Sequence, residues 1–260
     1  MKTIILAWKY LNYLLRSKTK YSIHSPFVYK LTTEVINSKK SSELVSKVEA
    51  LRNQLCKDNS TISITDLGAG SQINRLKTRK IKDIAKNSAK SEKYGQLLFR
   101  LCNHFQPRNS LELGTSLGIS ASYLALSKSQ KVYTLEGCPN TAKKAKKNID
   151  SLQINNVEII VGDFKETLVS TLEKIKTLDF GFLDGNHQEK PTIEYFEECL
   201  KYCNNNSVLI FDDIHWSDGM ENAWNYIKNH EKVFVSIDLF FVGIVFLNPN
   251  QKKEHFVIRY

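Results

Sequence analysis

Carboxylate side chains follow two apolar runs in the second half of the chain. Asp184 comes directly after the run DFGFL, and Asp212 and Asp213 come directly after SVLIF. Parallel strands end at the same edge of a sheet, so we expect these three carboxylates to lie close together. Like charges repel one another unless a cation lies among them, and oxygen ligands suit Mg²⁺ or another hard divalent ion. Helix capping, which two of the three aspartates could perform, is the alternative, and we favour the metal site.

Two histidines lie close to these aspartates in the sequence. His187 follows Asp184 by three residues, and His215 lies in the segment DDIHW, residues 212–216. An unperturbed imidazole has a pKa near 6.5, so either side chain suits a general base that works at neutral pH. We predict His187 as the base, with Asp184 beside it at the catalytic centre, and keep His215 as the competing candidate. Surface exposure alone would also explain a loop histidine.

The segment ELGTSLG, residues 112–118, has the pattern of a strand end, a glycine turn and a helix start. Gly114 and Gly118 permit a tight bend and let a ligand approach where a Cβ atom would block it. The first N–H groups of the following helix are free to bind that ligand. Glu136 ends the run KVYTL, about where nucleotide-binding folds place an acid that accepts the ribose hydroxyl protons. Turn and acid together predict a nucleotide-like ligand, whereas the glycines alone would equally fit helix packing.

The elements that must position these residues alternate regularly from Ser91 onward. Helical stretches separate five β runs, at about residues 110–113, 131–136, 157–161, 179–184 and 207–212. This alternation predicts an α/β fold with a parallel sheet and helices on both faces. Three further β runs follow, VFVSID, GIVFLN and HFVIRY, and residues 249–251 join the last two. They predict an antiparallel C-terminal hairpin.

The first 90 residues have a different, mainly helical pattern, and we expect a helical cap here. Ile4, Trp8, Leu11 and Leu15 recur at helical spacing and predict one apolar stripe on a packed helix. The apolar run is too short to span a membrane, and a helix lying on a membrane surface is the less favoured alternative. Residues 42–56 again show helical spacing.

A second glycine turn lies between these helices and the regular part of the chain. The segment TISITDLGAGS, residues 61–71, resembles a cofactor turn from Asp66 to Ser71. We expect a basic helical stretch from Asn74 to about Lys90 to follow it, and not a second strand. Counting strands therefore favours the later turn at residues 112–118, and the role of the earlier turn stays open.

The composition is that of an ordinary globular protein, with 37 basic and 27 acidic side chains in 260 residues. The net charge of +10 fits either an anionic partner such as RNA or a lysine-rich surface, and we favour the second reading. Five cysteines without a Cys-x-x-Cys pair or signal peptide fit a reduced, cytoplasmic protein with no membrane span. Cys199 and Cys203 lack a second pair to complete a zinc site, so we expect them in the core. The sequence leaves monomer or homodimer open.

Several segments taken together resemble the class I S-adenosylmethionine-dependent O-methyltransferases, and most closely the catechol O-methyltransferase type. They are KYGQLLFRL, LELGTSLGISA, Glu136, VGD at 161–163, FLDGNH and VLIFDD, in that order. The resemblance covers about residues 91–260. It implies a Rossmann-like methyltransferase domain there, with a mainly parallel seven-stranded sheet and an antiparallel hairpin, and leaves residues 1–90 as an N-terminal cap or extension.

By position, the resemblance implies which residues bind S-adenosylmethionine. Glu136 would hold the ribose and Asp163 would lie on the adenine side, while the glycine turn would line the methionine end. The expected cofactor-binding set is Glu112, Gly114, Thr115, Ser116, Gly118, Ser120, Glu136 and Asp163. Asp184, Asp212 and Asp213 would bind Mg²⁺.

Two positions depart from the catechol enzymes. Those enzymes carry asparagine at the position of Asp213, whereas similar sugar O-methyltransferases have Asp-Asp there. Catechol enzymes have a lysine base at the position of His187, and the sugar enzymes tend to have an acid at that of Asn186. The expected acceptor is therefore a hydroxyl of a small phenol, catechol or sugar-like molecule.

Other functions stay open at this point. An RNA acceptor such as tRNA would use the lysines at 143, 144, 146 and 147 together with the basic stretch from 75 to 86. A nicotinamide-dependent dehydrogenase is disfavoured because the turn lacks the Gly-x-Gly-x-x-Gly pattern. A non-catalytic nucleotide-binding protein with the same fold is disfavoured by the intact acidic set.

Overall fold

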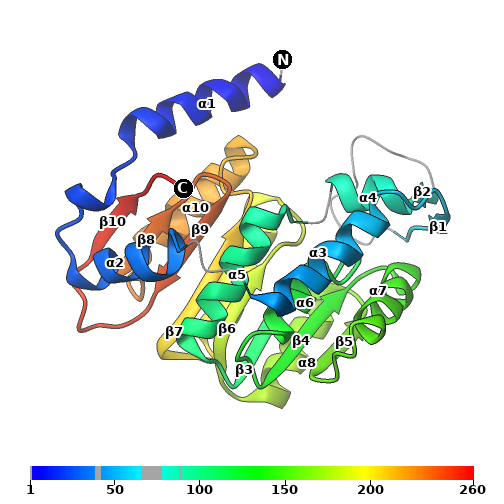
Figure 1. Ribbon diagram of the computed structural model, residues 1–260. Coiled ribbons are helices and arrows are strands. Elements are labelled where there is room, and N and C mark those ends of the chain that lie inside the picture. The colour runs from blue at the N-terminus through cyan, green and yellow to red at the C-terminus, as the bar shows by residue number, and fades with distance from the viewer. Residues whose placement is uncertain (1, 39–41, 66–77, 88–89) are drawn as a thin grey trace. The chain divides into compact units, whose positions relative to one another are not determined.

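The computed structural model describes residues 2–38, 42–65, 78–87 and 90–260. It divides into two compact units. The first unit combines residues 1–38 with residues 176–260, and the second comprises residues 39–175. Both units have α/β architecture, so the predicted alternation of strands and helices is confirmed (Figure 1).

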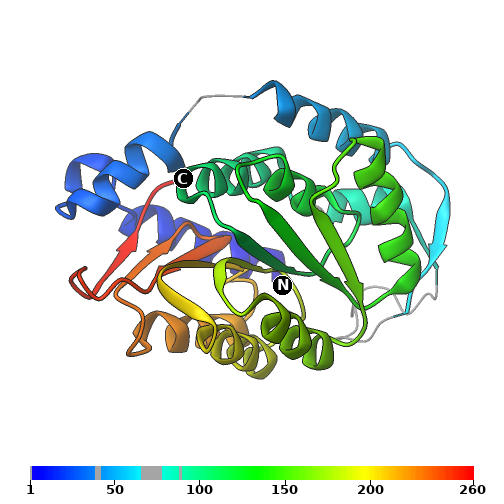
Figure 2. The ribbon, with the colours of Figure 1, turned by 90° about the horizontal axis from the view of Figure 1, so that it is seen from below.

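The second unit contains three parallel strands in the order β3-β4-β5. Leu113 pairs with Leu135 and Glu136 pairs with Val161, so the three strands end at the same edge. Helices α5, α6 and α7 lie on one face of these strands and α8 lies on the other (Figure 2). The bounds are α5 Glu92–Phe105, β3 Asn109–Leu113, α6 Ile119–Ala125, β4 Lys131–Glu136, α7 Pro139–Ser151, β5 Val157–Val161 and α8 Phe164–Ile175.

The remaining elements of the second unit precede these strands. Helix α3 (Glu43–Leu55) buries Val45, Val48, Leu51 and Leu55 in a core that includes residues of α4 and α6. Its helical spacing predicts the last three, but it also predicts Leu44, which is 43% exposed. Strand β1 (Thr61–Ser63) pairs antiparallel with β2 (Thr78–Lys80), and α4 covers only Ile81–Asn87.

The expectation of a basic helix from Asn74 to Lys90 is therefore wrong in part, because residues 78–80 form a strand paired with β1. Backbone pairing with a distant segment overrides the helical preference of these basic residues. The Asp66 to Ser71 turn lies outside the described residues, as do Arg75 and Lys77.

In the first unit the strand order is β10-β8-β9-β7-β6. Strands β6 and β7 are parallel, while β9 runs antiparallel to both β7 and β8. Helices α9 and α10 pack on one face of these strands (Figure 2). Phe196 of α9 and Trp224 of α10 contact Phe211 of β7. Phe27 of α2 contacts Phe246 of β9. The bounds are β6 Leu178–Leu183, α9 Glu189–Leu200, β7 Cys203–Asp212, α10 Asp218–Asn229, β8 Val235–Asp238, β9 Val242–Phe246 and β10 Glu254–Val257.

The C-terminal hairpin is confirmed for β8 and β9 but not for the last two strands. Strand β10 pairs in parallel with β8, with Phe256 opposite Ile237, and does not form a hairpin with β9. Within the described residues, β3 to β10 are eight strands, one more than the seven that the resemblance implies. The segment at residues 249–251 carries the chain past β9 to the outer side of β8.

The N-terminal segments of the first unit are helical, as predicted, but the apolar stripe of α1 is not packed. Trp8, Leu11 and Leu15 are 66%, 54% and 78% exposed. The buried face of α1 is instead built around Tyr13, which is 5% exposed and donates a hydrogen bond to the carbonyl of Ile258. Periodicity identifies a helix but not which side meets the core when both sides carry aromatic residues. The bounds are α1 Lys2–Arg16, η1 Lys20–Ser22, α2 Pro26–Leu31 and η2 Thr32–Ile36.

Two further sequence expectations concern the cysteines and the membrane. All five cysteines are free thiols, and Cys199 is fully buried while Cys203 is partly exposed. In the part of the chain that the structure describes, no helix combines the length and the apolar character that crossing a membrane requires.

Substitution of Gly95 tests how closely α5 packs against Tyr123 of α6. A Cβ atom at this position would lie 2.2 Å from Cε2 of Tyr123, whose ring is completely buried and cannot move aside. We expect Gly95→Ala to lower the free energy of unfolding by about 1–3 kcal/mol, as overpacking does.

Gly219 in α10 is the matched control, because a Cβ atom there meets nothing closer than 3.5 Å. Gly219→Ala should leave the protein as stable as the wild type, or more stable by up to about 1 kcal/mol, since alanine favours a helix. Urea unfolding of both variants tests this contrast, and equal stability of the two would contradict the packing.

Candidate functional site

The glycine turn after β3 has the backbone conformation that its sequence predicts. Gly114, Ser116 and Gly118 all have positive φ angles, of 97°, 49° and 79°. Gly118 needs glycine for a second reason, because an added Cβ atom would lie 3.1 Å from the Ile149 side chain and 3.3 Å from Cβ of Ala145. The turn is thus bent tightly and packed closely on α7.

Glu136 at the end of β4 holds this turn in place. Its Oε2 accepts a hydrogen bond of 2.9 Å from the N–H of Ser116, and its Oε1 accepts one of 2.9 Å from the N–H of Cys138. Burial raises the pKa of Glu136, and the two N–H donors oppose that rise. Turn and acid, identified separately in the sequence, are therefore parts of one site.

Glu112 lies beneath the turn and is completely buried. Its Oε2 accepts a hydrogen bond from the hydroxyl of Thr134, which also bonds with the hydroxyl of Thr115 at 2.6 Å. Its Oε1 has no hydrogen-bond partner among the described residues. Burial raises the pKa of Glu112 to about 7, although the hydroxyls of Ser120 and Thr134 act in the opposite direction. An unpaired buried carboxylate oxygen is costly, so this position fits a ligand that brings a hydrogen-bond donor.

Asp163 follows β5 and is engaged locally. Its Oδ1 accepts a hydrogen bond of 2.8 Å from the N–H of Lys165, so it caps the start of α8. Ser120 lies in the first turn of α6 and is buried. Hydrogen bonds thus connect Glu112 to Thr115 through Thr134, and Glu136 to Ser116. Asp163 has a helix-capping role of its own.

In the first unit, two of the three expected aspartates converge with a histidine. One ligand atom each of Asp184, His187 and Asp212 lies within 4.8 Å of the others. The Nε2 atom of His187 is 3.6 Å from Oδ1 of Asp184, and Asp212 is buried. Two carboxylates and an imidazole at this separation are a donor set that fits a divalent cation.

Asp213 is not part of that group of three. Its backbone is left-handed, with φ of 53°, and its N–H donates a 2.6 Å hydrogen bond to the carbonyl of Phe241. Asn186 and Phe240 also have positive φ angles, of 52° and 72°. Three non-glycine residues in this region at the ends of β6, β7 and β8 mark local backbone strain of the kind found at functional sites.

His215 is held between two carboxylates. Its Nδ1 lies 2.9 Å from Oε1 of Glu221, and its Nε2 lies 2.8 Å from Oδ2 of Asp238. Burial alone would lower the pKa of His215, but these carboxylates outweigh it and the net shift is upward. Both ring nitrogens are therefore occupied, which makes His215 a poor general base and leaves His187 as the better candidate.

Three aromatic residues that follow β7 and β8, Trp216, Phe240 and Phe241, differ in exposure. Phe240 is fully buried and stacks on His215, with ring centroids 5.2 Å apart. Trp216 and Phe241 are exposed. Phe240 is thus a core residue, whereas Trp216 and Phe241 expose part of their surface.

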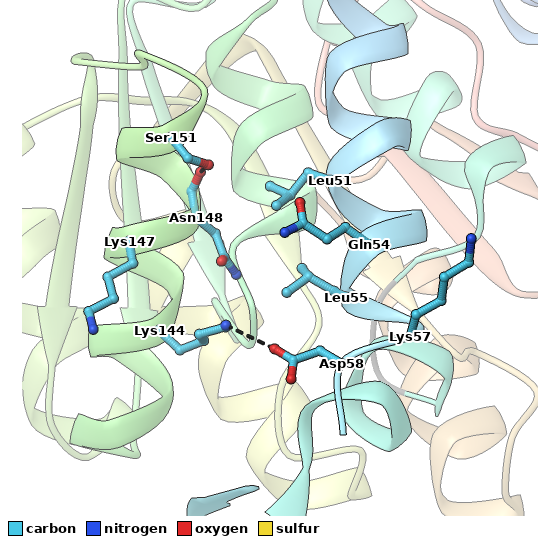
Figure 3. A pocket seen from close by; sticks show the side chains of 9 residues that line it. All are labelled: Leu51, Gln54, Leu55, Lys57, Asp58, Lys144, Lys147, Asn148 and Ser151. Atoms are coloured by element: carbon cyan, nitrogen blue, oxygen red, sulfur yellow. Dashed lines mark hydrogen bonds and ion pairs between the residues drawn. The ribbon is translucent and has the colours of Figure 1, made fainter. Parts of the chain in front are cut away.

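The lysines of α7 are partly paired. Lys144 forms a 3.2 Å ion pair with Asp58, and Lys146 pairs with Asp150, while Lys143 and Lys147 are exposed. Asp58 and Lys144 lie at one end of a pocket of about 430 Å³ between α3 and α7, which contains none of the expected cofactor or metal residues (Figure 3).

Comparison with known proteins supports the resemblance seen in the sequence. Residues 111–214 match a family described as "Methyltransferase domain". A catechol O-methyltransferase from Niastella koreensis is 33% identical over 126 residues, which are 47% of this chain and 55% of that protein. The chain thus spans about half the length of this curated relative.

Solved structures agree on the fold. A methyltransferase from Podospora anserina with S-adenosylhomocysteine bound has a TM-score of 0.59 at 15% identity, covering 87% of this chain and 97% of its own. The O-methyltransferase TomG from Streptomyces achromogenes, in complex with S-adenosylmethionine, has a TM-score of 0.55 at 19% identity, covering 85% and 95%. These structures confirm the Rossmann-like methyltransferase fold.

Glu112 makes the stability depend on pH. Its pKa is raised to about 7 from 4.5 by burial, so ionisation destabilises the folded state as pH rises through this window. We expect wild-type stability relative to Glu112→Gln to be greatest below pH 4.5, to fall by on the order of 3 kcal/mol as pH rises through 7, and to level off above about pH 8. Urea unfolding at a series of pH values tests this, and a pH-independent difference would contradict it.

Proposed function

We propose that this chain, whose residues 111–214 match a methyltransferase domain, is an S-adenosylmethionine-dependent O-methyltransferase acting on a small hydroxylated molecule. The observation that carries the proposal is the hydrogen-bonded unit of turn and acid, in which Glu136 binds Ser116 above the buried Glu112. We assign residues 91–260 to the methyltransferase domain and residues 1–90 to an extension that shapes it. A phenol, catechol or sugar-like acceptor is the class expected.

The residues of the glycine turn fit S-adenosylmethionine. The unpaired Oε1 of Glu112 suits the positively charged amine at the methionine end, since a buried carboxylate oxygen gains most from a charged donor. Glu136 keeps lone pairs on both oxygens for ribose hydroxyls, and Gly114 and Gly118 leave the backbone accessible. Asp163 is assigned to the adenine side. Cofactor-bound neighbours of the same fold support this choice.

The donor set of the first unit fits a divalent cation, with Mg²⁺ as the first choice. Asp184 and Asp212 would hold it, with Asp213 adjacent in sequence and His187 beside them. When bound, such a cation supplies charge that makes an acceptor hydroxyl more acidic and fixes its position.

His187 is the residue we assign to take the acceptor's proton. Its ring is partly exposed, so an incoming molecule can reach it, and Asp184 at 3.6 Å from Nε2 stabilises the imidazolium that forms. His215 is unsuited to this task because both of its nitrogens are engaged.

The proposed reaction is an in-line displacement. The hydroxyl proton passes to His187, the acceptor oxygen forms a bond to the methyl carbon, and the bond from that carbon to sulfur breaks with its electron pair on sulfur. S-adenosylmethionine supplies the methyl group as a sulfonium. Anion and cation neutralise each other along this path, so the protein contributes chiefly by holding the reacting groups in line.

A methyl-transfer assay tests the proposal. The protein is incubated with methyl-labelled S-adenosylmethionine and a mixed cell extract, with Mg²⁺ or with a chelator, and the products are divided into RNA and small molecules. Label in small molecules that disappears with chelator is the expected result. Label in RNA would overturn the acceptor class and point to the exposed Lys143 and Lys147 as phosphate contacts. No label in either fraction would contradict the proposed activity.

Asp184 tests the metal assignment. We expect Asp184→Ala to lower turnover by about 10²-fold or more, because loss of a ligand removes the charge that acidifies the acceptor. Affinity for S-adenosylmethionine, measured by calorimetry, should change little.

Asp179 is the matched control, because it lies on the same strand β6 but outside the group of Asp184, His187 and Asp212. Asp179→Ala should keep wild-type turnover. If Asp184→Ala keeps normal activity in the presence of chelator, the metal assignment is wrong.

A further inference from the structure

A second pocket lies entirely within the first unit, apart from the residues assigned to methyl transfer. It has a volume of about 390 Å³ and is bounded by α1, α10 and the C-terminal strands. Residues that line it include Trp8, Tyr13, Arg16, Trp224 and Lys228. A volume of this size accommodates a small organic molecule.

The carboxylates in this pocket are already paired. Glu221 and Asp238 bracket His215, with distances of 2.9 and 2.8 Å. Glu221 also forms a 3.1 Å ion pair with Lys9, which reaches Asp218 at 3.0 Å. This network links α1 to the start of α10 and pairs both carboxylates of the pocket with cationic or imidazole groups.

Two cations of the lining have no such partner. Lys228 and Arg16 form no hydrogen bond or ion pair with any residue the structure describes. Lys228 is half-buried, and burial lowers the pKa of its ammonium. Among the charges around Lys228, Asp238 opposes that shift most strongly, the charge of Arg16 adds to it, and Glu221 opposes it more weakly. A half-buried ammonium beside a second cation is costly, and an anion between them would offset that cost.

Aromatic rings supply part of the remaining surface of the pocket. Trp224 and Tyr13 are nearly completely buried, so only limited parts of their rings face the pocket, while Trp8 stands at its edge and is well exposed. Flat apolar surface of this kind binds the body of an aromatic or similar ligand. Together with the two cations, the pocket has one apolar region and one positive region.

We propose that this pocket binds a small organic anion, with its carboxylate or phosphate between Arg16 and Lys228 and its flat apolar body against Trp8 and Trp224. The planar guanidinium of Arg16 is suited to paired oxygens, and Lys228 adds a point charge. The site is separate from the cofactor-binding and metal residues proposed above and does not depend on the methyl-transfer activity.

Binding of three simple probes tests the proposal. Isothermal titration calorimetry of the full chain at low ionic strength uses benzoate, phenyl phosphate and the neutral benzamide. The wild type should bind at least one of the two anions about tenfold or more tightly than benzamide, since only the anions satisfy the two cations. The stronger anion identifies whether carboxylate or phosphate is preferred.

Lys228→Met locates the binding. It keeps the length and apolar stem of the side chain but removes the charge, so the preference for the anion over benzamide should fall about tenfold. Lys252→Met is the control, because Lys252 is exposed and does not line the pocket; it should keep wild-type binding.

Folding of Lys228→Met is checked by its thermal transition, which should not fall, because a desolvated charge is removed. If Lys228→Met is unfolded, Arg16→Gln replaces it in the same binding measurement. Arg16 lies at the end of α1 and is exposed, so its substitution should not disturb folding. Equal affinity of the wild type for anions and benzamide would overturn the proposal, as would unchanged anion preference in the folded Lys228→Met or Arg16→Gln protein.

Discussion

The pairing of Glu136 with the backbone of the glycine turn is the constraint on which the proposed cofactor site depends. One carboxylate binds the N–H of Ser116 in the turn and the N–H of Cys138 at the start of α7, both at 2.9 Å. It therefore ties the end of β4 to two loops at once. Because both oxygens retain lone pairs, the same group that shapes the site can still accept hydrogen bonds from a ligand.

Each unit contains unfavourable local features at its proposed site. In the second unit, Glu112 has a buried oxygen without a partner. In the first, Asn186, Asp213 and Phe240 adopt left-handed backbone conformations near the group of Asp184, His187 and Asp212. Such features persist where surrounding strands and helices hold them, and they fit sites that complete their interactions by binding a ligand. The rest of each unit, with its apolar strands and well-packed helices, supplies the stability that this requires.

The sequence predicted what depends on short-range pattern. Alternating runs identified the strands from β3 to β9, and the spacing of Gly114, Gly118 and Glu136 identified the turn with its acid. What depends on distant partners was missed. The parallel pairing of β10 with β8 and the strand at residues 78–80 arise from backbone pairing across the sequence. The buried side of α1 is set by Ile258, 245 residues from Tyr13, and the engagement of His215 by Asp238, 23 residues away.

Direct binding of S-adenosylmethionine is the measurement that tests the central claim most closely. Calorimetry on the wild type should give one site per chain, and Glu136→Ala should weaken it about tenfold or more, because the turn loses its support and the ribose its acceptor. Glu173→Ala, at an exposed position of α8, should bind as the wild type does. Absence of binding by the wild type, unchanged affinity in Glu136→Ala, or binding of a nicotinamide cofactor instead would contradict the account.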